Sequence, residues 1–238
     1  MATSLHQQLK LHYVADPERH EVDIAGYRID AINDQQQLIE IQCASLSSIR
    51  DKVRRLVSNY DVVVAKPLAA RKLIIRKSSA DGEQIGTRWS PSKQSLIHIF
   101  QDLVHFSRVF PHPRLRLDIL LTMQEEIRIP PQRRRRRQRK NDFAVHDRRL
   151  VEVTQHYQFR TPAELWTELG LEVPMEFTTA DMATQLGHPR WLCQKVAYCF
   201  REMGFLEVCS KQGNSIVYRQ VPQKIIRRRR QSTHHAPS

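Results

Sequence analysis

The stretch from residue 19 to residue 60 constrains the fold most, because the period of its apolar residues changes along it. Tyr27–Ile32 and Leu38–Gln42 alternate between apolar and polar residues, and a polar connection separates them, which predicts a β-hairpin. A serine-rich segment follows, and apolar residues then recur at helical spacing across residues 49–57. The stretch therefore predicts two strands followed by a helix.

Two carboxylates lie on the predicted strands, Asp30 on the first and Glu40 on the second. Side chains two positions apart in a strand share a face, so Glu40 and Gln42 project together. In the expected register Asp30 lies beside Glu40, and two close carboxylates repel unless a cation lies between them. Oxygen ligands suit Mg²⁺ or Mn²⁺. The alternative is a pair of solvated carboxylates at a sheet edge.

The same residues resemble the core of the PD-(D/E)XK nuclease superfamily, in which an Asp and a Glu bind metal and a lysine two residues after the Glu assists the attacking water. The segments HEVDIAGYRIDAI, LIEIQ and IRDKVRRLV are more closely similar to an uncharacterised prokaryotic family with this core and a C-terminal winged helix. The resemblance implies an α/β fold, in which a PD-(D/E)XK-like mixed sheet with flanking helices precedes a winged helix-turn-helix domain.

The resemblance also implies roles for individual residues. Asp30 and Glu40 would bind the Mg²⁺ or Mn²⁺ ion, with the main-chain carbonyl of Ile41 as a further ligand. Gln42 stands where the superfamily usually has its lysine, and Lys52 on the following helix would take the place of that lysine.

Three further observations concern acidic residues and histidines. Glu21 on the preceding strand is a candidate third acid. Related chains carry a Glu just before a Ser-Leu-His sequence, where this chain has Ala2. No histidine pair on the predicted helices has the i, i+4 spacing of a metal site, so we assign structural roles to His6, His12, His98 and His105.

The net charge of +13 is concentrated in two tracts. Residues 133–140 hold seven basic residues and residues 227–230 hold four, so the rest of the chain carries only +2. Arginine runs bind phosphate backbones without reading sequence. The candidate phosphate-binding residues of the first tract are Arg133, Arg134, Arg135, Arg136 and Arg137. The alternative is a solvated linker and tail.

Length and composition limit the class of protein. The 238 residues, of which 40% are hydrophobic, suit one large or two small domains. No run approaches the roughly 20 apolar residues of a membrane span, and no signal peptide precedes the first helix. The four cysteines form no CxxC pair, which argues against a zinc site and for reduced thiols. We therefore expect a cytoplasmic protein without a membrane segment.

Apolar periodicity and turn residues divide the remaining chain into elements. Expected helices span residues 4–14, 95–107, 142–156 and 161–169, and expected strands span residues 61–65, 71–77 and 115–123. The helix between the strands at 38–42 and 61–65 makes a crossover, so part of the sheet should be parallel.

Pro130-Pro131 and the arginine tract mark the clearest boundary. We expect a nuclease-like domain (1–129), an Arg-rich linker (130–141), a winged-helix domain (142–222) and a basic disordered tail (223–238).

Residues 177–219 resemble a winged helix-turn-helix, since Gly187 and Pro189 separate two helices and a hairpin follows. The outward face of the second helix carries Arg190, Trp191, Gln194, Lys195, Tyr198 and Arg201. Basic and amide side chains on such a face reach phosphates and base edges, and Lys211 in the hairpin is placed to touch the backbone. The alternatives are packing of the two aromatic residues against another helix and ordinary solvated charges.

Three functions fit these features. The first is Mg²⁺-dependent hydrolysis of phosphodiester bonds, with DNA as the expected partner and RNA as the second candidate. The second is a catalytically inactive DNA-binding protein or regulator that uses the winged helix. The third is an RNA-binding or assembly factor that uses the arginine tracts alone.

Replacing Arg133–Arg137 with Gln should flatten the salt dependence of DNA binding. Each phosphate contact on duplex DNA contributes about −0.9 to the slope of log K against log salt. Fluorescence anisotropy across a series of salt concentrations measures this slope, and an unchanged slope would rule the tract out as a phosphate-binding segment.

Overall fold

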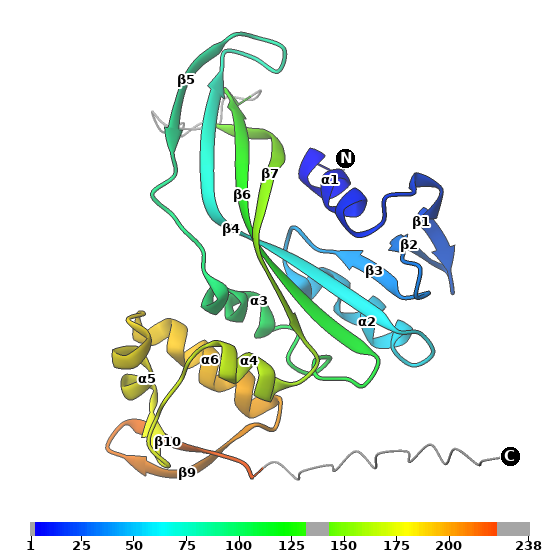
Figure 1. Ribbon diagram of the computed structural model, residues 1–238. Coiled ribbons are helices and arrows are strands. Elements are labelled where there is room, and N and C mark those ends of the chain that lie inside the picture. The colour runs from blue at the N-terminus through cyan, green and yellow to red at the C-terminus, as the bar shows by residue number, and fades with distance from the viewer. Residues whose placement is uncertain (1–2, 132–142, 223–238) are drawn as a thin grey trace, which may run out of the picture.

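The computed structural model describes residues 3–131 and 143–222. A seven-stranded mixed sheet organises the first part, with strand order β1-β2-β3-β4-β6-β7 and β5 paired to β4 (Figure 1). Its strands are β1 His20–Ile24, β2 Tyr27–Ile32, β3 Leu38–Ile41, β4 Val62–Lys77, β5 Gln84–Trp89, β6 Leu115–Ile129 and β7 Ala144–Phe159. Its helices are α1 Ser4–Tyr13, α2 Arg50–Leu56 and α3 Phe100–Leu103, and 3-10 turns at Leu46–Ile49 and Leu96–Ile99 lead into α2 and α3.

The predicted hairpin, the helix after it and the parallel crossover are confirmed. β2 and β3 pair antiparallel, and β3 pairs parallel to β4 with Leu38 opposite Val62 and Glu40 opposite Val64. β4 also pairs parallel to β6 along most of its length. The expected helix at 95–107 is shorter than predicted, since it consists of the 3-10 turn and α3.

The separation of residues 61–65 and 71–77 into two strands is wrong, because β4 continues through Pro67. The carbonyl of Ala65 accepts a hydrogen bond from Gln42, so this residue faces β3. Alternate residues of a strand face alternate neighbours, so Pro67 also points to the β3 side, where β3 has already ended. The missing N–H of proline therefore costs the ladder no bond there.

The helix predicted at 142–156 is also wrong, and so is the domain boundary at 142. Those residues lie in β7, which pairs antiparallel with β6 from Leu117 opposite Phe159 to Ile129 opposite Ala144. Tertiary context decides here, because the free edge of β6 supplies backbone partners that a local pattern cannot reveal. The residues of the second sheet therefore begin only after β7.

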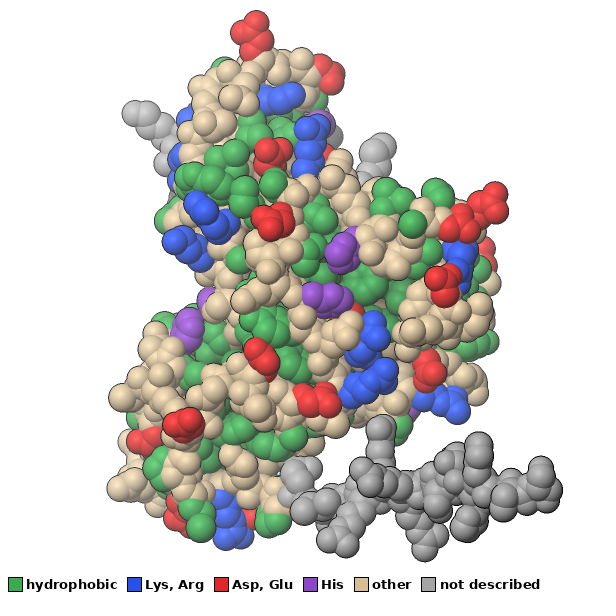
Figure 2. All heavy atoms as spheres, in the orientation of Figure 1, with side chains coloured by type: hydrophobic (Ala, Val, Ile, Leu, Met, Phe, Trp, Pro, Cys, Tyr) green, Lys and Arg blue, Asp and Glu red, His purple; other side chains and the backbone are tan. Residues whose placement is uncertain are grey.

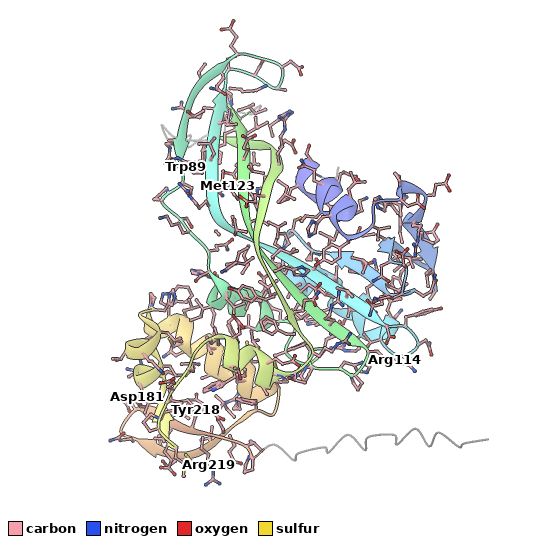
Figure 3. The ribbon with its side chains drawn as sticks, in the orientation of Figure 1. Trp89, Arg114, Met123, Asp181, Tyr218 and Arg219 are labelled. Atoms are coloured by element: carbon pink, nitrogen blue, oxygen red, sulfur yellow. The ribbon has the colours of Figure 1, made fainter. Side chains whose placement is uncertain are left out.

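The long strands extend past the rest of the sheet as an arm, made of β5 with residues 71–77, 123–129 and 144–152 (Figures 1 and 2). β5 was not predicted. Its last residue is Trp89 (Figure 3), and the guanidinium carbon of Arg71 lies 4.4 Å from the centre of the Trp89 ring. Inside the arm the buried carboxylate of Glu126 contacts three cations, Lys72, Arg128 and Arg148. Burial alone would raise the pKa of Glu126, but the three cations lower it to about 2.

The C-terminal part holds three helices and a three-stranded antiparallel sheet of order β8-β10-β9. Its elements are α4 Pro162–Glu168, β8 Phe177–Thr178, α5 Thr179–Leu186, α6 Arg190–Glu202, β9 Leu206–Gln212 and β10 Ser215–Gln220. Capping boxes begin α4 at Thr161 and α5 at Thr178, and Gly187 ends α5 with a φ of 62°. The predicted order of helix, turn, helix and hairpin is therefore present.

Two hydrophobic clusters lie on opposite faces of the large sheet. α1 covers one face through Leu5 and Leu9. The other cluster includes α2 and α3 and continues into the C-terminal helices, where the ring of Phe200 lies 5.4 Å from Phe100 and 5.0 Å from Trp166. One continuous core therefore joins the large sheet to the C-terminal part.

Phe200→Ala should lower the free energy of unfolding by about 3–5 kcal/mol, because it removes a fully buried ring from that core. Urea denaturation followed by tryptophan fluorescence measures the change. Gln194→Ala, on the exposed side of the same helix, is the control and should alter the stability by less than about 0.5 kcal/mol. Similar midpoints for the two variants would contradict a shared core.

Candidate functional site

Four ionisable side chains from four elements meet where β2 and β3 pair. His6 comes from α1, Asp30 from β2, Glu40 from β3 and Lys52 from α2. Nε2 of His6 lies 3.2 Å from Oδ2 of Asp30, and Nζ of Lys52 lies 2.5 Å from Oε1 of Glu40. The helices on the two faces of the sheet thus each supply one basic group to one carboxylate.

The local fold explains why the two acids lie together. Ala31 pairs with Ile39 across the hairpin, so Asp30 comes next to Glu40 and Ile41. The main-chain N–H of Ile41 donates a hydrogen bond of 2.7 Å to Oδ2 of Asp30. Ile39 and Ile41 pack in the α1 cluster, which turns Glu40 to the α2 face.

The surroundings shift the pKa values of the two carboxyls in opposite directions from their usual values. Burial raises the pKa of Glu40 to about 7; the Lys52 ammonium opposes this rise, and the nearby Asp30 charge adds to it. Burial also works to raise the pKa of Asp30, but the contacts with His6 and the Ile41 N–H outweigh it, and that pKa is lowered. At neutral pH Asp30 is therefore ionised, while Glu40 is poised between its two forms.

The pairing of Glu40 is incomplete. Its Oε1 atom is enclosed and lacks a hydrogen bond of acceptable geometry among the described residues, although Lys52 Nζ is close. The Lys52 ammonium, which has three N–H groups, also donates to the carbonyl oxygen of Arg28. Glu40 thus keeps a carboxylate oxygen whose only compensation is a neighbouring charge.

The side chain of Gln42 makes its polar contacts away from the carboxylates. Its Nε2 donates to Ser48 Oγ at 2.9 Å, and its Oε1 accepts from the N–H of Ala44 at 2.8 Å. These contacts hold the loop that leads from β3 into α2. The structure therefore gives Gln42 a role in positioning this loop.

Glu21, the predicted third acid, is paired elsewhere. It contacts Lys10, which is fully buried, and Arg28 at 2.6 Å. Within the described residues no polar contact joins Glu21 to Asp30 or Glu40. The backbone of Glu21 has a φ of 56°, which interrupts the pairing of β1 with β2 opposite Asp30.

His6 is the residue that sequence reasoning missed, because it was assigned a purely structural role. It lies 24 residues before Asp30, and no local spacing links the two. Only the packing of α1 on the sheet brings them together. Its second ring nitrogen, Nδ1, is enclosed without a hydrogen-bond partner among the described residues.

A second buried pair stabilises the same loop and was not anticipated either. Lys66 on β4 lies 3.1 Å from Asp102 on α3 and donates to the carbonyl of Ala44. Asp102 also accepts from the N–H of Leu46 at 3.2 Å. Because these contacts tie the loop to α3, the position of α2 and its Lys52 depends on them.

The predicted nucleic-acid face of α6 is exposed in part. Trp191 is 50% exposed and Tyr198 is 36% exposed. Arg190 instead donates to Ser215 Oγ at 2.9 Å, and Arg201 lies 3.3 Å from Glu202. Gln194 and Lys211 are exposed and Lys195 is half-buried. Ala2 and Arg133–Arg137 lie outside the described residues.

The described residues contain neither a cluster of metal ligands nor a membrane-spanning helix. Among residues 3–131 and 143–222, no three His, Cys, Asp or Glu side chains group as metal ligands. No helix in those ranges has the length and apolar character needed to cross a membrane.

Wild-type stability should fall relative to that of Glu40→Gln as the pH rises from 5 to 8. The pKa of Glu40 is about 7 in the folded chain and near 4.5 when unfolded, so folding favours its protonated form. The stability from this preference is complete below pH 4.5 and is lost as the pH approaches 7. The relative loss should be about 2 kcal/mol, measured by urea denaturation.

Glu18→Gln is the control for this measurement, since Glu18 is exposed near the start of the same sheet. Its stability relative to wild type should stay constant across the same pH range. A constant difference for Glu40→Gln as well would contradict the elevated pKa of Glu40.

The chain is similar to a protein family of unknown function and to a bacterial protein. Residues 3–160, which contain the whole large sheet and the four site residues, match the family described as "Domain of unknown function (DUF8091)". A protein of Treponema pallidum (strain Nichols), described as "Uncharacterized protein", is 28% identical over 220 residues, which cover 92% of this chain and 86% of that protein. No solved structure matches the chain. Since the match covers more than half of its length, the chain belongs to the DUF8091 family.

Proposed function

We propose that the chain is a nuclease-like protein that acts on nucleic acid through Asp30 and Glu40. The observation that carries the proposal is the convergence of these two acids, on adjacent strands, with Lys52 from the next helix. Two carboxyls with pKa values pushed apart are typical of sites that move protons or hold a cation. We assign the large sheet to the PD-(D/E)XK type on this basis.

The site residues fit a divalent cation. Glu40 has a buried carboxylate oxygen without a satisfactory hydrogen bond, and Asp30 is kept ionised by its neighbours. Carboxylate oxygens are the ligands that Mg²⁺ and Mn²⁺ prefer. Asp30 and Glu40 would hold the ion, with the carbonyl of Ile41 as the expected third ligand. Once bound, the ion would polarise a phosphoryl oxygen and lower the pKa of a coordinated water.

The other residues of the site would position these groups. His6 keeps Asp30 ionised and oriented from the α1 side. Lys52 neutralises Glu40 in the absence of a ligand, and its ammonium would turn to the phosphate when a cation takes over that task. Gln42 is not basic near neutral pH, so its contribution would be the loop geometry described above.

The C-terminal part would supply affinity for the substrate. The order α4, β8, α5, α6, β9, β10 supports a winged-helix assignment, in which α6 is the recognition helix. Gln194, Lys195 and Lys211 are accessible for contacts to the backbone. We propose DNA as the main partner and RNA as the second.

A catalytically inactive nucleic-acid-binding protein or regulator is the second candidate. The observation that favours it is the pairing of both carboxylates within the chain, Asp30 with His6 and Glu40 with Lys52. In such a scaffold the ion pairs stabilise the hairpin and need no metal. Metal binding and cleavage therefore decide between the two functions.

Calorimetry with Mn²⁺ should give binding heats for the wild type and none for Asp30→Asn or Glu40→Gln, because one carboxylate rarely holds such an ion against its hydration shell. Below pH 7 the affinity should fall by up to about tenfold per pH unit, since the ion must displace the proton on Glu40. Asp34→Asn, at an almost fully exposed acid in the connection between β2 and β3, is the matched control and should bind like wild type.

Cleavage is measured on mixed DNA and RNA substrates with Mg²⁺, Mn²⁺ or EDTA. Lys52→Ala should lower the rate more than the metal affinity. Equal Mn²⁺ heats for wild type and Asp30→Asn would reject the metal site. Normal metal binding without cleavage of any substrate would favour the second candidate.

A further inference from the structure

A polar groove lies between the two parts of the molecule, away from the acids. It has a volume of about 430 Å³ and is lined by Arg50, Arg54, Val104, His105, Ser107, Arg108 and Tyr198. We call this set the junction groove. Its residues come from α2, from the turn after α3 and from α6.

We propose that the junction groove binds a nucleotide unit of single-stranded nucleic acid, with its phosphate on α2 and its base on Tyr198. The class of ligand rests on the proposed function, whereas the location and the preference for a single strand are new. The cation site at Asp30 and Glu40 takes no part in this binding.

The charge of the groove favours phosphate. Arg50 and Arg54 share one carboxylate, Asp51, at 3.2 and 3.1 Å, and Arg108 pairs with Glu202 at 3.0 Å. Three guanidinium groups therefore face two carboxylates, and the imidazole of His105 adds a further donor.

The ion pairs in the groove can exchange for a ligand. The side chains of Arg50, Arg54 and Asp51 are 43%, 53% and 67% exposed, and exposed pairs contribute only about 0–1 kcal/mol. A guanidinium has five N–H donors, of which Arg54 gives one to Asp51 and Arg50 gives two. Planar donors therefore remain for a phosphate, which arginine binds in a bidentate manner.

The aromatic side of the groove favours an unpaired base. Tyr198 is partly exposed, and Trp191 lies two turns earlier on the same face of α6. Each ring has a cation beside it, Arg201 at 5.5 Å from Tyr198 and Lys195 at 5.6 Å from Trp191. Aromatic rings flanked by cations are typical of single-strand binding, where bases stack on the rings. In a duplex the base faces are already stacked, so Tyr198 would find no partner.

The groove is also linked to the candidate site through α2. Lys52 on this helix faces Glu40, while Arg50 and Arg54 face the groove. A strand whose phosphate lies on Arg50 and Arg54 would therefore run beside the helix that carries Lys52.

The test is fluorescence anisotropy of a labelled ten-nucleotide oligothymidylate with the full chain in EDTA. Arg50→Gln/Arg54→Gln should weaken binding about fivefold or more and reduce the salt slope by about 1.4, because each single-strand phosphate contact contributes about 0.7. Arg76→Gln/Arg88→Gln removes the same charge from exposed positions on the arm and is the matched control. It should change the affinity by less than about twofold.

The contribution of the Tyr198 aromatic ring is tested separately. Tyr198→Leu should weaken binding about fivefold or more, whereas Tyr198→Phe keeps the stacking face and should stay within about twofold of wild type. If the two Tyr198 variants bind alike, or if the arm control weakens binding as much as the α2 variant, the proposal is overturned.

Two further measurements separate the possible outcomes. Thymidine 5′-monophosphate is added as a competitor, at the same concentration of phosphate groups as the oligonucleotide. If it displaces the oligonucleotide, the result would support the site but assign it to a free nucleotide. Mn²⁺ calorimetry on Arg50→Gln/Arg54→Gln should match wild type. Unchanged oligonucleotide binding by Arg50→Gln/Arg54→Gln, with normal Mn²⁺ heats, rejects the groove alone. Weakened oligonucleotide binding by that variant, with no Mn²⁺ heats even for the wild type, rejects only the proposed metal site.

Discussion

The parallel pairing of β4 with β6 is the interaction on which the rest of the structure depends. It runs from Val62 opposite Leu115 to Arg76 opposite Arg128, far beyond the end of β3. At one end both faces of this pair are covered, by α1 on one side and by α2 and α3 on the other. At the other end the pair continues into the arm, where β5 and β7 complete it. β3, β5 and β7 each pair directly with one of these two strands.

Competition between burial and charge compensation determines the properties of the acids at the candidate site. Asp30 receives a main-chain N–H and an imidazole, which together outweigh its loss of hydration. Glu40 is more deeply enclosed, and burial prevails over the ammonium of Lys52 and the N–H of Asp30. Buried Glu126 in the arm illustrates the opposite extreme, since its three cations overwhelm its burial. The number of donors around a buried carboxylate thus separates a structural acid from a reactive one.

The relation between the large sheet and the C-terminal part bears on function as well as on stability. Phe200 and Phe100 join the two in one core, so α6 is held in a defined position relative to α2. The exposed side of α6 therefore does not stand alone, because Tyr198 shares the junction groove with the arginines of α2. A ligand on α6 would contact both parts of the molecule, which relates substrate binding to the helix that carries Lys52.

The sequence by itself determined the elements whose causes lie within a few residues: the hairpin that carries Asp30 and Glu40, the helix after it, and the parallel crossover. Periodicity, caps and turns are local, so the chain can be read for them directly. Only the tertiary structure decided that residues 144–159 form a strand, since the edge of β6 supplies their backbone partners. It also decided that His6 meets Asp30, because neighbours distant in the chain set the contacts, the burial and hence the charge of each group.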